Sequence, residues 1–251
     1  MLPRPAVELT EAGPMKNIVV LTDDRMEEAA QARSHLLGLG YRVETVPRQI
    51  RLWDEAALRQ WAEPLAGDLL GAIHPAPPRI LGSIEAVRED EWARAADEGP
   101  MAAWCATKVF CGLMKENGGG SMIYLNSVHA EKPVGFGALF SMGCGATQML
   151  AREAAQDYGE YGVGVYFIQK GVTAADPDSK SPVSGFYFGA DLRCAGRKLP
   201  EPDCLNELIA FLLTPGAMPL TGSDLRADDA MTLFYTHRRK IEGRTYYEIE
   251  V

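Results

Sequence analysis

Apolar residues along this chain come in short blocks that alternate with amphipathic stretches. The block at 16–22, KNIVVLT, is the β-branched run of a buried parallel strand, and Glu27–Gly38 continues with a helical pattern that ends in glycine. Strand-like blocks recur at 41–46 and 68–73, on either side of an amphipathic helical stretch at 54–66. Strands that alternate with helices predict an α/β fold with a parallel sheet.

The most distinctive pattern spans residues 118–173. A strand ends at the polar step Asn126-Ser127, a loop follows, a helix starts near Gly137, and a further strand comes after it. That helix carries no charged residue from Ala138 to Leu150. A helix that is apolar on every side must be covered on every side, so one side should face the sheet and another a second subunit. The pattern therefore predicts an oligomer.

The remaining elements complete one domain. The stretch 89–115 is predicted to be a long helix interrupted near Gly99-Pro100, and 203–213 and 219–228 are a predicted helix and last strand. We expect a flexible leader at 1–14, a domain at 15–230 and a C-terminal arm at 231–251. Within the domain, 174–202 is a long loop with an aromatic cluster at 186–188.

Composition and charge narrow the class of protein. The chain has 251 residues, enough for one sizeable core, and its 25 Lys and Arg against 34 Asp and Glu give a net charge of −9. This acidic balance argues against a general nucleic-acid or membrane-surface role. The five cysteines are odd in number and lack paired ligand spacing, which indicates reduced thiols and neither a disulfide framework nor a metal site. No apolar run is long enough to span a membrane. We expect a cytoplasmic protein.

The turn after the first strand has unusual charge for a nucleotide site. A dinucleotide pyrophosphate needs glycines, so that the backbone can approach it, and a free helix N-terminus. This turn contains no glycine and instead carries four carboxylates, those of Asp23, Asp24, Glu27 and Glu28. Asp24 and Glu27 have the spacing of a capping box, which predicts that side chains occupy the free amides of the helix. The sequence therefore predicts a blocked cofactor turn.

The strand, loop, helix and strand at 118–173 resemble the second half of a short-chain dehydrogenase/reductase, a Rossmann-type family of about this length. Members of that family have a serine at the strand end, a tyrosine thirteen positions later and a lysine four beyond it. Here Ser127 matches the serine, but Phe140 and Cys144 stand at the other two positions. The family's asparagine, counted from Trp92, falls on Gly99. The resemblance implies a single doubly wound, Rossmann-type domain whose catalytic positions are vestigial.

The chemical consequence follows from the side chains. Transfer of a hydride to or from an alcohol needs a proton relay, and Phe140 has no proton to give. A neutral thiol at Cys144 is a weak donor, and a thiolate has the wrong charge to replace an ammonium. We expect that this chain has no intact catalytic residue and binds no NAD itself.

The resemblance then suggests a non-catalytic subunit that pairs with an active short-chain dehydrogenase, which would bind the NAD. In the family, helices equivalent to 89–115 and 137–158 build the subunit interface, so a tetramer through them is expected. Heteromeric members with an inactive subunit are known, including one that oxidises a 2-(hydroxybenzyl)succinyl-CoA-type hydroxyacyl-CoA. The pattern of losses in this chain is similar to that of such a subunit.

Two other functions are open. One is a cofactor-independent enzyme on the same fold, similar to halohydrin dehalogenases, with a new site at Ser127, His129 and Cys144. The other is an active NAD(P) oxidoreductase with displaced motifs, which the turn at 23–28 disfavours because that turn does not depend on the alignment.

Three further features have a structural and a functional interpretation. His74 is more simply a structural residue than a catalytic one, and Arg48 a solvated residue than a ligand of a 2′-phosphate. The basic run of Arg238, Arg239 and Lys240 is a solvated surface or a site for the phosphates of a coenzyme A-type substrate.

Overall fold

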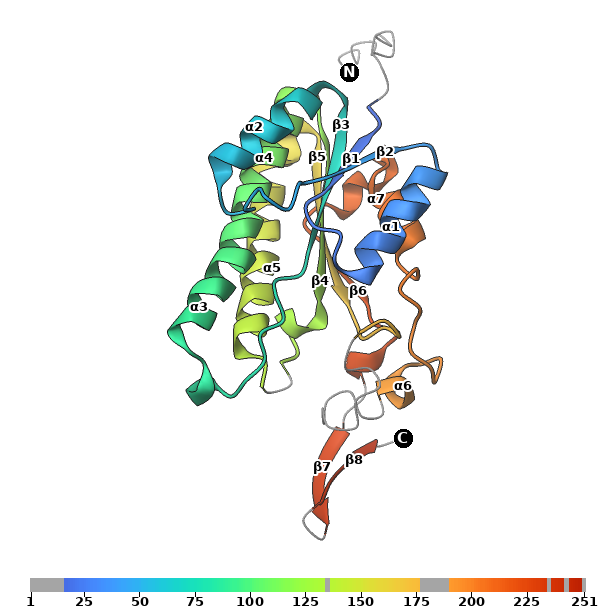
Figure 1. Cartoon of the computed structure of the whole chain (residues 1–251). Helices are drawn as coiled ribbons and strands as arrows, with labels where there is room; N and C mark the ends of the chain where they lie inside the picture. The colour runs from blue at the N-terminus through green and yellow to red at the C-terminus, as the bar shows by residue number, and fades with distance from the viewer. Residues whose placement is uncertain (1–15, 134–135, 177–189, 234–235, 242–243, 250–251) are drawn as a thin grey trace, which may run out of the picture.

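A parallel sheet of six strands forms the centre of the computed structural model, which describes residues 16–133, 136–176, 190–233, 236–241 and 244–249. The strands follow the order β2-β1-β3-β4-β5-β6, and every neighbouring pair is parallel. Helices flank the sheet (Figure 1), so the predicted Rossmann-type α/β fold is confirmed. The strands are β1 Ile18–Leu21, β2 Arg42–Thr45, β3 Leu69–Pro75, β4 Gly120–Ser127, β5 Val163–Lys170 and β6 Asp224–Ala227.

Alternate residues of β1 face opposite sides of the sheet, and both sides are covered. Val19 and Leu21 pack in the core under α1 (Glu27–Gly38) and α7 (Asn206–Leu212). Ile18 and Val20 pack in the second core, under α2 (Glu55–Ala62), α4 (Ala102–Glu116) and α5 (Ala138–Tyr158). This two-sided burial explains the apolar strand blocks of the sequence.

The long helix predicted at 89–115 is kept almost continuous by a π-helical segment. α3 (Glu89–Ala96) leads into η3 (Asp97–Met101), which is π-helical and contains Pro100, and α4 follows directly. A π turn absorbs the extra residue and the missing amide of the proline, so the predicted interruption becomes a widening of the helix.

Other boundaries move by a few residues, for local reasons. The helical stretch at 54–66 ends as α-helix at Ala62 and continues as the 3-10 segment η1 (Glu63–Asp68), which has Pro64 near its start. At its other end, Asp54 caps α2 by accepting a hydrogen bond from the Ala57 N–H at 3.1 Å. The remaining short helices are η2 Ile84–Ala86, η4 Val128–Ala130, η5 Gly159–Tyr161, α6 Ala190–Arg193, η6 Pro215–Leu220 and η7 Met231–Leu233.

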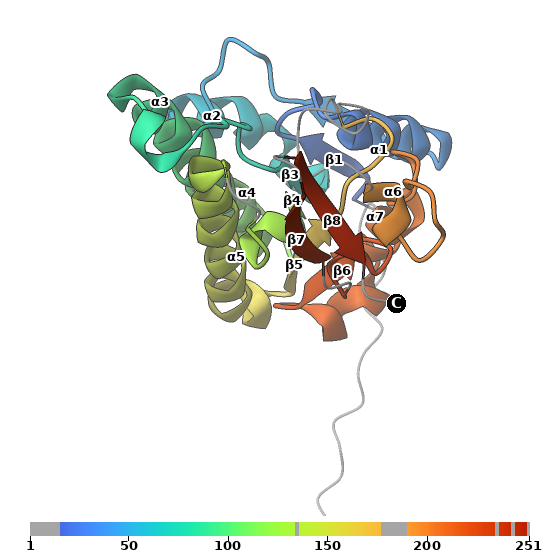
Figure 2. The ribbon, with the colours of Figure 1, turned by 90° about the horizontal axis from the view of Figure 1, so that it is seen from below.

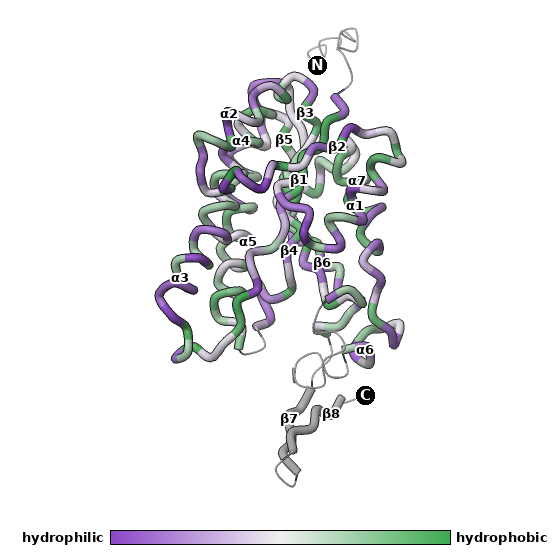
Figure 3. The backbone as a smooth tube through the Cα atoms, in the orientation of Figure 1, coloured by the Kyte–Doolittle hydropathy of each residue, from purple (hydrophilic) through white to green (hydrophobic). Residues whose placement is uncertain are grey.

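The uncharged helix α5 has one open apolar side within the single chain. Phe140 and Cys144 are buried against the domain, whereas Met142 and Met149 are 52% and 53% exposed. Most of α5 and the adjoining α4 are coloured white to green for their hydropathy (Figure 3). The expected covering of α5 on all sides is therefore incomplete in one chain.

The C-terminal arm is a β-hairpin that forms a separate two-stranded sheet. β7 (Thr236–Ile241) and β8 (Arg244–Ile249) pair antiparallel, with Arg238 opposite Tyr247 and Arg239 opposite Tyr246. The hairpin stands away from the body beyond the carboxyl ends of the sheet strands (Figures 1 and 2). The arm predicted at 231–251 thus contains a hairpin, and the basic run at 238–240 lies in its first strand.

Some predicted features lie outside the described residues, namely the leader at 1–14 and the aromatic cluster at 186–188. The five cysteines are free thiols, and four of them are buried. Within the ranges that the structure describes, no helix is both long and apolar enough to cross a membrane.

The close contact between β3 and β4 predicts a strict requirement for glycine at position 71. A Cβ on Gly71 would lie 2.8 Å from the Ser121 carbonyl oxygen and 2.6 Å from Leu213 Cδ2. Gly71→Ala should therefore lower the free energy of unfolding by about 1–3 kcal/mol, measured from urea denaturation. Gly67→Ala is the control, since no atom lies within 4 Å of its added Cβ; equal stability of the two variants would contradict the expectation.

Candidate functional site

The polar groups of this domain converge at the carboxyl edge of the sheet, where ligands bind in open parallel sheets. β3, β4 and β5 end there at Pro75, Ser127 and Lys170, and Thr22 directly follows β1. All four residues line one cavity of about 810 Å³. The turn at 23–28, the proline-rich loop at 75–79 and the segment 170–176 complete its wall. The cavity thus includes both the region expected to hold a cofactor and the region expected to hold the proton relay.

Ser127 and Phe140, at two of the four positions matched to the family's catalytic residues, meet at this cavity through His129. Ser127 is buried at the end of β4, and its Oγ accepts a hydrogen bond from the backbone N–H of His129 at 3.3 Å. The His129 ring packs edge-on against Phe140, with their centroids 5.0 Å apart. The ring at the position matched to the family's tyrosine is therefore held by an aromatic contact.

Cys144, the third position, is inert. Its side chain is fully buried, and burial raises the pKa of the thiol well above its ordinary value. The group stays protonated at neutral pH, so it supplies neither a positive charge nor a nucleophile. The buried neutral thiol argues against the alternative catalytic site of Ser127, His129 and Cys144. The hydrogen bond between His129 and Ser127 also uses the backbone N–H of His129, so it provides no general base for Ser127.

The proline-rich loop requires small residues at the positions around it. A Cβ on Gly99, the fourth vestigial position, would lie 3.2 Å from Pro77 Cβ. A Cβ on Gly143 of α5 would lie 2.9 Å from Pro77 Cγ. Pro77 therefore packs against both the π segment and α5, and an asparagine at position 99 would require the loop to move.

The predicted capping box at the turn 23–28 is wrong, so the predicted occupation of the first amides of α1 by its side chains is not observed. α1 begins at Glu27 with Met26 as its N-cap, and no side chain makes a capping hydrogen bond. Asp24 lies two residues too early to cap this helix. Its carboxylate instead lies 3.9 Å from Arg48, whose side chain is 82% exposed, and Glu27 accepts a hydrogen bond from Gln31.

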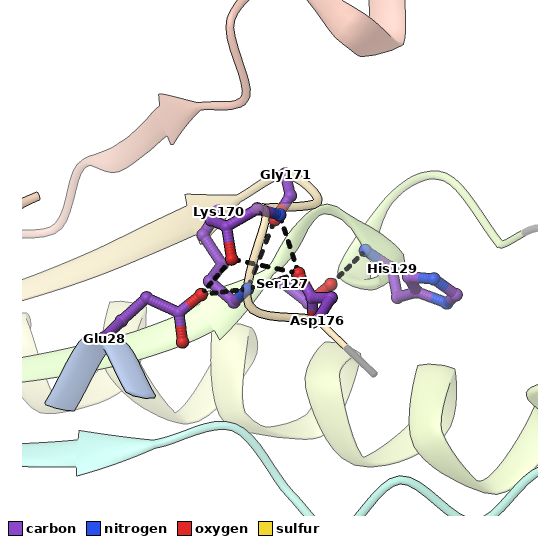
Figure 4. A network of polar contacts seen from close by, with 7 residues as sticks. Glu28, Ser127, His129, Lys170, Gly171 and Asp176 are labelled. Carbon is purple, nitrogen blue, oxygen red and sulfur yellow. Dashed lines mark hydrogen bonds and ion pairs between the residues drawn. The ribbon is translucent and has the colours of Figure 1, made fainter. Parts of the chain in front are cut away.

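The fourth carboxylate of the turn makes a contact that the sequence did not predict. Glu28 points from α1 across to the end of β5 (Figure 4), where its Oε1 lies 2.7 Å from Lys170 Nζ and accepts a hydrogen bond from Thr173 Oγ1 at 2.7 Å. Asp176 joins the same group: its Oδ2 lies 3.0 Å from Lys170 Nζ and accepts from the Thr173 N–H at 2.7 Å. Glu28, Lys170 and Thr173 are all buried.

The charges in this cluster determine the protonation of Lys170. Burial opposes the charged ammonium, but Asp176 and Glu28 outweigh that effect and raise the pKa of Lys170 above its ordinary value. The lysine is therefore a permanent cation bound to two carboxylates. A lysine at the end of a predicted buried strand could have indicated this ion pair, because a buried ammonium needs an anion. The sequence did not identify which carboxylate would be its partner.

His74 is a structural residue in the wall of the cavity. It is buried in β3, and its Nδ1 lies 2.8 Å from Thr22 Oγ1 at the end of β1. Burial lowers the pKa of His74 to about 4, and burial together with the charge of Arg79 lowers that of His129 to about 4. Both imidazoles are neutral at pH 7. Among the residues that the structure describes, no cluster of His, Cys, Asp and Glu has the arrangement of a metal site.

Comparison with known proteins gives the same architecture. A family model described as enoyl-(acyl carrier protein) reductase matches residues 55–232, more than two thirds of the chain. A tropinone reductase homolog of Arabidopsis thaliana is 26% identical over 147 residues, which cover 58% of this chain and 48% of the relative. Glucose 1-dehydrogenase 2 of Bacillus subtilis is 23% identical over 146 residues, covering 58% and 57%. The matched segment spans about half the length of these curated relatives.

Solved structures agree in fold over a longer stretch. A short-chain type dehydrogenase/reductase from Mycobacterium ulcerans has a TM-score of 0.77 at 18% identity, over 87% of this chain and 90% of that one. A gluconate 5-dehydrogenase from Burkholderia cenocepacia, solved with NADP and tartrate, has a TM-score of 0.75 at 15% identity, over 88% and 96%. At this level of identity the likeness concerns the fold.

The neutral, buried His74 predicts a pH-dependent stability. Its pKa is 6.5 when unfolded and about 4 when folded, so the unfolded chain binds the extra proton. The stability associated with neutral His74 is complete above pH 6.5 and is lost as the pH falls towards 4, by up to about 3 kcal/mol. In His74→Asn, the free energy of unfolding should depend less steeply on pH across this window than in the parent chain, by about one proton. Parallel curves in urea titrations would contradict this.

Proposed function

Because this chain belongs to the short-chain dehydrogenase/reductase family of oxidoreductases, we propose that it is a non-catalytic member that works as a subunit beside an active dehydrogenase. The observation that carries the proposal is the pair of Phe140 and Cys144 at the positions of the proton relay. Phe140 is packed against His129, and Cys144 is a buried neutral thiol.

The chemistry of an alcohol dehydrogenase makes this loss decisive. Oxidation of an alcohol removes a hydride from carbon and a proton from oxygen, and the proton must pass to a group held beside that oxygen. A phenyl ring cannot accept it. Cys144 offers no charge that would lower the pKa of a neighbouring hydroxyl. Only Ser127 remains of the four positions, and a serine alone has neither a suitable pKa nor a base to complete the transfer.

The cofactor region supports the same proposal. A diphosphate needs close approach to backbone amides and a positive local field. Here the turn has no glycine, and the Glu28 carboxylate, at the second residue of α1, is already bonded to Lys170 and Thr173. Asp176 adds a further negative charge to the cluster. The residues present do not fit a dinucleotide, and we propose that the partner subunit holds the NAD.

The surface of the helices suggests where the partner binds. Met142 and Met149 on α5 are about half exposed, as are Trp104 on α4, Met101 in η3 and Trp92 on α3. Large apolar side chains gathered on neighbouring helices are typical of protein interfaces. The proposal places an active short-chain dehydrogenase subunit on this side, in a tetramer assembled through α3, α4 and α5.

The substrate proposal rests on the pattern of losses. That pattern resembles the inactive subunit of the heteromeric 2-[hydroxy(phenyl)methyl]succinyl-CoA dehydrogenase of anaerobic toluene breakdown. The assembly would accordingly oxidise a hydroxyacyl-CoA at the partner's site. We propose that the C-terminal hairpin, which contains the basic run at 238–240, contacts a neighbouring subunit or substrate phosphates.

The first experiment is a calorimetric titration of NAD into the purified chain and into the complex that co-purifies with it. We expect no binding to the chain alone and, in the complex, one NAD per partner subunit. Phe140→Tyr, alone and with Cys144→Lys, should produce no dehydrogenase activity in the isolated chain, because the turn at 23–28 is unchanged. Tight NAD binding by the chain alone, or turnover by a folded variant, would refute the proposal.

The apolar side of α5 makes a second expectation. Met142→Glu together with Met149→Glu should dissociate the complex in size-exclusion chromatography with light scattering, because two charges would enter a desolvated interface. The fold should survive, since both side chains are half exposed. Leu39→Glu is the matched control: Leu39 is 55% exposed but follows α1 on the opposite face of the sheet. Unaltered assembly of the double variant would place the interface elsewhere.

A further inference from the structure

The cluster of Glu28, Lys170, Thr173 and Asp176 joins two parts of the fold that are distant in sequence. Lys170 and Thr173 belong to the end of β5 and the loop after it, whereas Glu28 comes from α1, 142 residues from Lys170. Glu28, Lys170 and Thr173 are 4%, 6% and 2% exposed, so the contact is shielded from water. The side chain of Asp176 is 21% exposed and lies at the edge of the cluster.

The two carboxylates have different roles. Asp176 lies in the same loop as its partners and accepts the Thr173 N–H, so it holds that loop in shape. Glu28 contributes a single oxygen, Oε1, that receives both the Lys170 ammonium and the Thr173 hydroxyl, each at 2.7 Å. An ammonium and a hydroxyl that converge on one oxygen are the donor set of a small-anion site. The anion in this case is attached to the protein.

We propose that Lys170 and Thr173 form an anion-binding site whose ligand is the protein's own Glu28 carboxylate. The Lys170 ammonium is buried and needs a negative partner, and Glu28 is the more deeply buried of its two carboxylates. The position of Glu28 in the first turn of α1 adds a favourable interaction with the positive end of the helix. The bound carboxylate therefore connects α1 to the β5 loop without any external ligand.

The proposed anion site goes beyond the proposed function, and its test is separate, because it concerns one chain and requires neither NAD nor a partner. Its consequence is that removal of the carboxylate should uncover a site for a free carboxylate ion. Formate is the suitable probe, since it is a carboxylate without a side chain and restores the original charge of the cluster.

The test compares the melting temperature of the full chain with that of Glu28→Ala, as formate is titrated at constant ionic strength. Glu28→Ala leaves Lys170 with one partner and a vacant space, so its melting temperature should fall by on the order of 10 °C. Formate should restore much of this loss with saturation, while chloride should not. Glu28→Gln is the matched control, because an amide fills the space without a charge, and formate should restore little.

Two results would overturn the proposal: an unchanged melting temperature in Glu28→Ala, or a response to formate no larger than in the parent chain or in Glu28→Gln. If Glu28→Ala does not fold in buffer, refolding with formate is the equivalent measurement, and failure with and without formate counts against the proposal. The paired variant Glu28→Leu with Lys170→Met removes anion and cation together. It should melt above Glu28→Ala and show no response to formate; a melting temperature as low as that of Glu28→Ala would also overturn the proposal.

Discussion

Burial of the parallel sheet on both faces is the constraint on which the rest of this structure depends. Alternate residues of each central strand enter two separate cores, so the strands carry almost no polar side chains until they end. Polar groups are therefore concentrated at the carboxyl edge, where Thr22, His74, Ser127 and Lys170 line one cavity. Any chemistry this fold performs, and any loss of chemistry, is expected at that edge.

Close packing surrounds the edge positions that match the family's catalytic residues. Phe140 packs on His129, Cys144 is buried without charge, and Pro77 occupies the space beside Gly99 and Gly143. A single substitution at one of these positions would leave its neighbours in place, because Pro77 is packed against Gly99 and against Gly143 beside Cys144. Under the proposal of a non-catalytic subunit, the absence of a proton relay would be a property of this local core.

The same edge remains well ordered by internal contacts. The four carboxylates at 23–28 would repel one another without partners. Asp23, Asp24 and Glu28 are paired with Arg25, Arg48 and Lys170, respectively, and Glu27 accepts a hydrogen bond from Gln31. The pair of Glu28 and Lys170 differs from the others because it is buried and links distant elements. Buried ion pairs of this kind make the geometry specific even where their net stabilisation is small.

Much of this protein follows from the sequence alone. The α/β class, the bounds of α1 and the start of α5 follow from hydrophobic periods and glycine positions. The absence of a proton relay, inferred from the spacing of Ser127, Phe140 and Cys144, stays a prediction. The capping-box prediction failed because the residue at which a helix starts depends on the backbone angles at Met26, which the three-residue spacing of Asp24 and Glu27 does not specify. The partners of Glu28 and Pro77, and the open side of α5, depend on contacts between residues far apart in the chain. Local sequence patterns determine which helices and strands form, because they reflect backbone propensity and the spacing of buried residues. Only the tertiary structure decides which side chains of different elements come into contact.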